Sequence, residues 1–174
     1  MKSKATVFAV LTLVAAFSRL FPHYPNFTAM GALAFYTAYS GKNVFQSLAL
    51  MAGTMMLTDL VLNNLVYPSG EFVFMYAGSL FTYLGFAAYT LSGYLSKSRK
   101  GAALGLIAGS IIFFAVSNFG VWFSAFSPYP KTATGLLAAY TAAIPFYAPE
   151  LLSSILFSAL AGYAESRVEA TANA

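Results

Sequence analysis

The sequence predicts an all-α membrane protein, a single domain (1–174) built as a bundle of about six transmembrane helices. Hydrophobic residues make up 59% of the 174 residues and charged residues only 8%, and the mean hydropathy is +0.71. This composition cannot provide the polar surface that a soluble domain needs. A helix needs about 20 mostly apolar residues to cross a hydrocarbon core. The predicted spans lie at residues 5–21, 27–40, 43–65, 72–95, 101–126 and 147–164.

The distribution of Lys and Arg predicts that both termini are cytoplasmic. The first span is followed by a loop with Pro22 and Pro25, and the fourth span ends at the basic loop 97–100. With a cytoplasmic N-terminus, only Arg19 and Lys131 fall on the outer side, which is the bias that the positive-inside rule describes. The cytoplasmic cations are then Lys2, Lys4, Lys42, Lys97, Arg99, Lys100 and Arg167.

The segment after the fifth span allows two interpretations. Residues 132–163 are apolar over a stretch too long for one untilted span, and they contain Pro145 and Pro149, which interrupt helices. A seventh span would place Glu150 at the inner face and the C-terminus outside. We favour the other interpretation, in which 132–145 is a re-entrant or surface-lying lid on the outer face, followed by the sixth span.

The composition also limits the chemistry of the protein. The absence of Cys excludes disulfides and thiolate sites, and one His with five carboxylates makes a rich acid–base apparatus improbable. We therefore expect neither an enzyme nor a bound cofactor. The polar residues that remain gather toward the outer side in the predicted topology, so a binding site is expected there.

Asp59 is the first candidate, because a carboxylate within a span marks a functional site unless it is paired. Asn63 lies four residues further along and shares its helical face. Together they present a carboxylate and an amide toward one point. The alternative is that Asp59 pairs with Arg19 at the outer end of the first span and holds two helices together.

The loop 21–28 is the second candidate. Two prolines three residues apart predict an extended turn that holds His23, Tyr24 and Asn26 at the mouth of the bundle. A single His without neighbouring ligands does not predict a metal site, and His23 would ligate a metal only if the ligand carried one.

The third candidate lies at the outer end of the fifth span. Asn118 and Trp122 are four residues apart on one face, and the turn that follows contributes Tyr129 and Lys131. An intramembrane Asn also bonds to other helices, and Trp also anchors spans at the interface. The convergence of three outer segments favours a pocket for a flat or partly apolar ligand.

Small residues spaced by four positions occur in several spans. Ala5 and Ala9 form such a pair in the cytoplasmic half of the first span. Pairs of this kind allow close approach of helices. They serve packing within the bundle or the docking of a partner.

Four segments of the chain carry a resemblance to a known family. These are RLFPHYPNFTAMGALA at 19–34, LTD at 57–59, SNFGVW at 117–122 and YPKT at 129–132. Together they resemble an uncharacterised family of small bacterial membrane proteins. In topology and size this family is similar to the S-components of energy-coupling factor vitamin transporters, which is an analogy of fold.

That similarity implies a bundle in the bacterial cytoplasmic membrane that binds a vitamin or related micronutrient from outside. It also implies a transmembrane coupling subunit, docked through an Ala-x-x-x-Ala pattern that Ala5 and Ala9 match, and ATPases on separate chains. Cobalamin-like compounds are one ligand class it suggests, although the cobalt-binding Cys expected in some members is absent and His23 would have to replace it.

Three functions remain open from the sequence. We favour the substrate-binding transport component. The alternatives are a structural or accessory subunit of a larger membrane complex and, less favoured, a membrane enzyme that uses His23 and Asp59 for simple proton transfer.

Overall fold

The computed structural model describes residues 2–172, and every regular element in that range is helical. The all-α fold is therefore confirmed. A short π-helical turn, η1, continues α3 without a break. The elements are α1 (Lys2–Leu20), α2 (Met30–Gly41), α3 (Val44–Val61), η1 (Leu62–Val66), α4 (Ser79–Leu95), α5 (Arg99–Phe123) and α6 (Ala133–Ala172).

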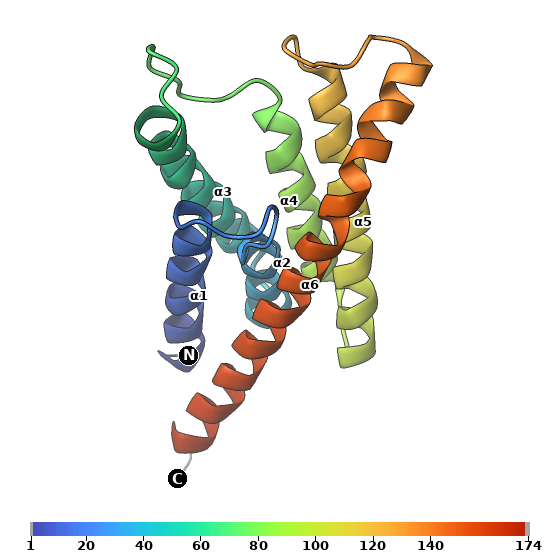
Figure 1. The fold of residues 1–174 in the computed structure, drawn as a ribbon. Helices are drawn as coiled ribbons and strands as arrows, with labels where there is room; N and C mark the ends of the chain where they lie inside the picture. Colours follow the sequence, from blue (N-terminus) through green and yellow to red (C-terminus); the bar gives the residue numbers. More distant parts are fainter. Residues whose placement is uncertain (1, 173–174) are drawn as a thin grey trace.

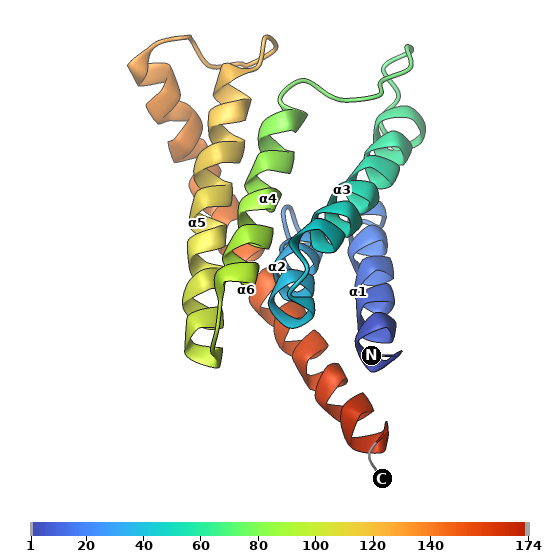
Figure 2. The same ribbon diagram turned by 180° about the vertical axis from the view of Figure 1, so that it is seen from behind.

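The helices run between two ends of the molecule (Figure 1). One end, here called the terminus end, holds the start of α1 and the end of α6. The other, the loop end, holds the connections 67–78 and 124–132. Toward the loop end α3 diverges from α4, α5 and the first half of α6, and the view from behind shows the same separation (Figure 2).

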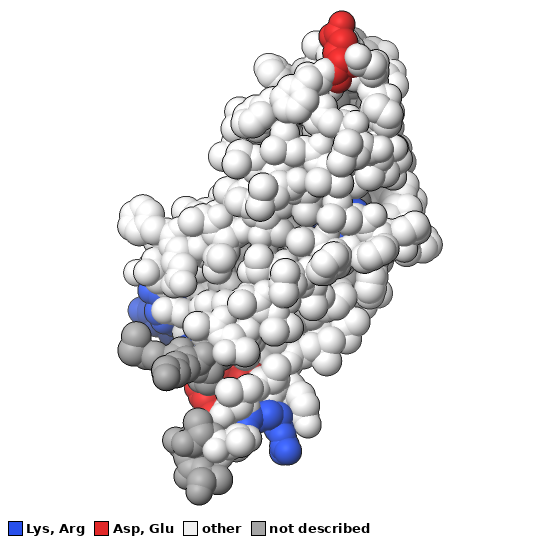
Figure 3. Space-filling view, turned by 90° about the vertical axis from the view of Figure 1, so that its left-hand side faces the viewer, with Lys and Arg blue, Asp and Glu red and all other residues white. Residues whose placement is uncertain are grey.

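Within the described residues, three helices are long and apolar enough to cross a membrane: Val44–Val66, Arg99–Phe123 and Ala133–Thr171. Large hydrophobic side chains are exposed along them, for example Leu57, Ile111 and Leu137. One side of the molecule is nearly free of charged side chains across its middle, and its charges gather toward the two ends (Figure 3). The protein therefore has the helices and the apolar surface of a membrane protein in contact with lipid.

Helix α2 differs from the predicted second span. It has 12 residues, which gives a length of about 18 Å, well short of the hydrocarbon core. It begins only at Met30, after the proline-containing loop, and ends where Lys42 takes a left-handed conformation with φ of 54°. Residues 30–38 are all buried, so its apolar sequence reflects enclosure by the other helices.

Helix α6 corrects both interpretations of residues 132–163. The segment 132–145 is not a lid, because Ala133–Ala172 form one helix of 40 residues that continues through Pro145 and Pro149. Each proline costs the backbone one hydrogen bond, and membrane helices tolerate this loss where the freed carbonyl is satisfied locally. At its start, the backbone N–H of Gly135 donates to the Thr132 hydroxyl at 3.1 Å.

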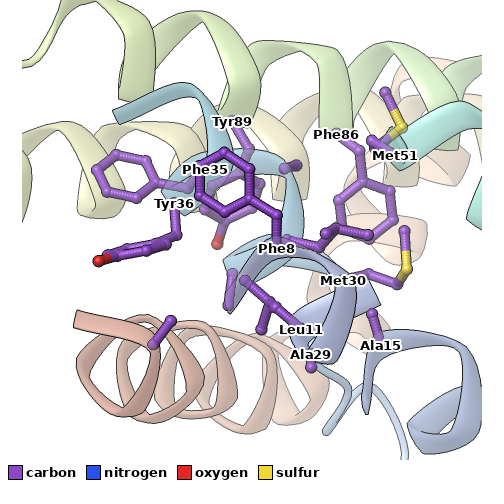
Figure 4. Close-up of a cluster of buried hydrophobic side chains, with 14 of the residues drawn as sticks. Phe8, Leu11, Ala15, Ala29, Met30, Phe35, Tyr36, Met51, Phe86 and Tyr89 are labelled. Atoms are coloured by element: carbon purple, nitrogen blue, oxygen red, sulfur yellow. The ribbon is translucent and has the colours of Figure 1, made fainter. Parts of the chain in front are cut away.

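The hydrophobic core surrounds α2 (Figure 4). Met30 and Phe35 of α2 lie among side chains of the neighbouring helices, including Phe8 and Leu11 of α1 and Phe86 of α4. A glycine permits close approach of α4 to α2, because a Cβ at Gly93 of α4 would stand 2.2 Å from the carbonyl oxygen of Phe35. Beyond this core, toward the terminus end, a cavity of about 780 Å³ lies between α2, α5 and α6.

Candidate functional site

Two adjoining cavities lie between the loop end and the packed core. Their volumes are about 400 Å³ and 240 Å³, and residues from α4, α5, α6 and the loop 21–29 line them. The larger cavity extends along α5 and α6, and the smaller one reaches α1 and the start of α2. The residues that line both are Asn26, Tyr76, Thr82, Phe113 and Glu150.

Glu150 is the buried acid of this site. Its residue exposure is 6%. The hydroxyl of Tyr89 donates to Oε1 at 2.6 Å, and the Ser154 hydroxyl donates to the same oxygen at 3.2 Å. The hydroxyl of Ser110 donates to Oε2 at 2.6 Å. Helices α4, α5 and α6 thus contribute hydroxyls to one carboxylate.

Glu150 has no ion-pair partner. Within residues 2–172 the ion pairs are Lys4–Glu165 and Arg19–Asp59. Its partners among the described residues are therefore hydroxyl groups, which offset only part of the cost of burying the group in its charged form. Helix α2 bounds the site at Gly31, where a Cβ would stand 2.1 Å from Ser154 Oγ and 3.3 Å from Glu150 Oε1.

Glu150 is not among the site residues predicted from the sequence, where it bears only on the topology of the last segment. A usable signal was present, because Glu150 is the only acidic residue between positions 133 and 164, and an ionisable residue in such a segment is a site candidate by default. Tyr89 and Ser110 carry no comparable signal, because nothing local shows that they face Glu150.

Aromatic rings form much of the cavity walls. Phe113, Phe114, Phe146 and Tyr147 line the larger cavity, and the rings of Phe114 and Tyr147 meet edge to face with centroids 5.3 Å apart. Tyr76 donates from its hydroxyl to Thr82 Oγ1 at 3.1 Å. Burial raises the pKa of the Tyr76 phenol, so this group stays a neutral donor.

Arg19 and Asp59 form an ion pair between α1 and α3. The Asp59 carboxylate also accepts a hydrogen bond of 3.0 Å from the Tyr83 hydroxyl and is buried. Arg19 lines the smaller cavity, whereas Asp59 does not. The pairing that the sequence offered as an alternative is therefore present, and the buried Nε of Arg19 has no hydrogen-bond partner.

Asn63 does not face the point that the sequence analysis assumed. It lies in η1, where the backbone changes to π-helical hydrogen bonding, as the bond of 2.8 Å from Tyr67 N–H to the Leu62 carbonyl shows. The four-residue spacing from Asp59 therefore no longer implies a shared α-helical face. The Asn63 side-chain nitrogen is buried without a partner, and the residue lines neither cavity.

The loop 21–29 lies deeper than predicted. Both ribbon views place it near mid-height, well below the connections 67–78 and 124–132 (Figures 1 and 2). His23 and Asn26 line the cavities, whereas Tyr24 is 65% exposed and lines neither. Within the described residues, no group of three or more His, Asp or Glu side chains is placed to hold a metal ion.

The third candidate cluster divides into two roles. Asn118 and Tyr129 line the larger cavity. Trp122 and Lys131 instead hold the connection 124–132. The indole N–H of Trp122 donates to the Pro130 carbonyl at 2.8 Å, and Lys131 Nζ lies 5.5 Å from the Trp122 ring centroid and donates to the carbonyls of Trp122 and Ser124.

Ala5 and Ala9 lie on the exposed side of α1, near the terminus end. Val10 and Leu13 of the same helix are also exposed. The pair therefore does not serve the packing of α1 against the rest of the bundle.

The family model described as a family of unknown function, DUF6580, matches residues 1–171. The chain belongs to this family. The match extends over the loop 21–29, all six α-helices and both candidate cavities. No curated protein and no solved structure matches the chain. The family assignment therefore shows common descent and gives no function.

Proposed function

We propose that the protein is the solute-binding component of an uptake system in the bacterial cytoplasmic membrane. In this proposal the six-helix bundle has its terminus end in the cytoplasm and receives a vitamin or related micronutrient from outside. The observation that carries the proposal is the pair of adjoining cavities, which have aromatic walls and end at the buried Glu150. A mostly apolar hollow with a few inward polar groups is the usual form of a small-molecule site.

The charge distribution supports the orientation. Lys4, Lys42, the basic loop 97–100 and Arg167 all belong to segments at the terminus end. Helices α1 and α2 form a hairpin that turns at mid-height, and the remaining helices return the chain to the terminus end. Both termini are then cytoplasmic under the positive-inside rule.

The cavity volumes favour a compact ligand. Cavities of about 400 Å³ and 240 Å³ suit a solute of the size that ordinary ligand pockets hold. A corrinoid is much larger than either cavity. Among the micronutrients that the S-component analogy suggests, the geometry therefore favours small ring compounds over cobalamin.

The proposal includes partners on other chains. The exposed side of α1 that carries Ala5 and Ala9 supports docking of a transmembrane coupling subunit, with ATPases supplying the energy. These partners follow only from the analogy of topology with S-components that the sequence suggests.

A thermal-shift screen of the purified protein tests the proposal. The compounds are vitamins, cobalamin and its precursors, flavins, haem and other tetrapyrroles. A ligand at one hundred times its Kd stabilises the folded state by about 2.7 kcal/mol, so a true ligand raises Tm measurably. Absence of any shift in a folded protein would overturn the proposal and favour an accessory subunit.

A matched pair of variants localises the binding. Ala142 lines the larger cavity, whereas Ala138, four residues earlier on α6, is exposed and lines neither cavity. Ala142→Phe fills part of the cavity and is expected to abolish the ligand-induced shift. Ala138→Phe is expected to keep it, and an equal loss in both variants would contradict the placement of the site.

A further inference from the structure

The geometry points to a small organic cation as the ligand, with its positive nitrogen bound to the carboxylate of Glu150 and its apolar part between the aromatic walls. This inference rests on the proposed function and names the chemical class of the solute. Two independent observations carry it: the buried carboxyl group with hydroxyl partners only, and the composition of the walls.

The carboxylate provides the first step. Glu150 is buried, lines both cavities and has hydroxyl partners only. The other two carboxylates that are buried to this degree, Asp59 and Glu165, each have a cationic partner, Arg19 and Lys4. A buried carboxylate that remains charged needs an opposite charge nearby. At Glu150 the cavity is the place from which such a charge can come.

The walls provide the second step. The larger cavity has no Lys or Arg in its lining. The one cation that lines the smaller cavity, Arg19, is already paired with Asp59. No Lys or Arg of the lining is therefore ion-paired with Glu150. The rings of Phe113, Phe114 and Tyr147 present π-faces or edges along the same hollow, and aromatic faces attract organic cations.

The fixed geometry of Glu150 supports recognition of a nitrogen. Tyr89, Ser110 and Ser154 hold the carboxylate from three helices, so it is oriented before a ligand arrives. An ammonium group can then add a charge-assisted hydrogen bond to an oxygen that already accepts from hydroxyls. A neutral isostere of the same shape lacks that interaction and still fits the walls.

Three probes of one shape test the inference: 2-phenylethylamine, which is a cation at pH 7, 2-phenylethanol, which is neutral, and phenylacetate, which is an anion. Binding to the purified wild-type protein is measured by Tm shift and by fluorescence of the single Trp. The amine is expected to bind at least about tenfold more tightly than the alcohol, which corresponds to one charge-assisted contact, and the anion more weakly than both.

Glu150→Gln removes the charge and keeps the size of the side chain. It is expected to bring the amine-to-alcohol affinity ratio close to one without weakening the alcohol. The control is Glu165→Gln, which changes another buried carboxylate on the same helix that is paired with Lys4 and lines neither cavity, and is expected to keep the ratio. If Glu150→Gln does not fold, the ratio in the wild-type protein decides alone.

The outcomes separate this inference from the proposed function. Four results would overturn the inference of an organic cation. They are equal affinity for amine and alcohol, preference for the anion, an affinity ratio that Glu150→Gln does not change, and no binding of any of the three probes at 10 mM. If NaCl displaces the amine and choline chloride at equal ionic strength does not, the site binds a metal cation and the inference is also overturned. The vitamin screen decides the proposed function separately, because a neutral or acidic vitamin that binds would sustain that function and refute the cation.

Discussion

The phenol of Tyr89 donates a hydrogen bond of 2.6 Å to the carboxylate of Glu150, and both residues are buried. This bond connects α4 to α6 at the depth where the cavities end. Because the two residues are 61 positions apart in the sequence, the bond forms only when the helices pack in their final arrangement.

Replacing Tyr89 by Phe is expected to destabilise the fold by about 1–3 kcal/mol, because it keeps the ring and removes one donor from a buried carboxylate. The measurement is the Tm of the detergent-solubilised protein. Tyr94→Phe is the control, since Tyr94 lies on the same helix and is 41% exposed. Equal effects of the two substitutions would show that the hydrogen bond contributes nothing.

Removing one partner of the Arg19–Asp59 ion pair is expected to destabilise the fold more than removing both partners. Arg19→Leu leaves a buried carboxylate without its cation, which destabilises folded proteins by about 3–5 kcal/mol. The double variant Arg19→Leu/Asp59→Leu is expected to recover part of this loss. The measurement is the unfolding of the wild-type protein, the single variant and the double variant. A double variant less stable than Arg19→Leu would contradict the ion-pair account.

A methyl group at Gly93 is expected to prevent normal packing of α2 against α4. The Cβ of Gly93→Ala would stand 2.2 Å from the Phe35 carbonyl oxygen, which belongs to rigid helix backbone. Gly53→Ala is the matched control, because nothing lies within 4 Å of a Cβ at that position. The yield of monodisperse protein and its Tm should fall for Gly93→Ala alone, and tolerance of both would show that the close approach is wrong.

Lys131→Met is expected to loosen the connection 124–132 without unfolding the bundle. The change removes two carbonyl contacts and the cation over the Trp122 ring. Limited proteolysis should cut this connection faster, and the fluorescence of Trp122 should indicate that its ring is more exposed to water. Lys97→Met, at an exposed position in the basic loop at the other end, should change neither property.

The orientation can be measured directly because the chain has no Cys. Ala125→Cys in the connection 124–132 is expected to react with a membrane-impermeant maleimide in intact cells, and Lys97→Cys only after the cells are opened. The parent protein provides the unlabelled control. The reverse pattern would place the terminus end outside and refute capture of the solute from the outer side.

The sequence was sufficient to predict the helical membrane class and to offer the pairing of Arg19 with Asp59, because both follow from the cost of placing charges among apolar segments. It could not predict that α2 is short, since hydropathy does not distinguish burial in protein from burial in lipid. The continuity of α6 was missed because Pro145 and Pro149 were weighed as helix breaks. The environment of Glu150 depends on how α2, α4, α5 and α6 meet, and no local pattern encodes that meeting.

The short α2 lines the smaller cavity at Glu150 through Gly31 and a separate cavity through Phe35 and Tyr36. The cavity of about 780 Å³ toward the terminus end, lined by Phe35 and Leu106 among others, shares no lining residue with the two cavities at Glu150. In the proposed function, a solute bound at Glu150 would have to pass the residues that separate these cavities. Its delivery to the cytoplasm would require α2 or α6 to leave its present position, so the work of translocation would consist of moving a helix and not of opening a gate.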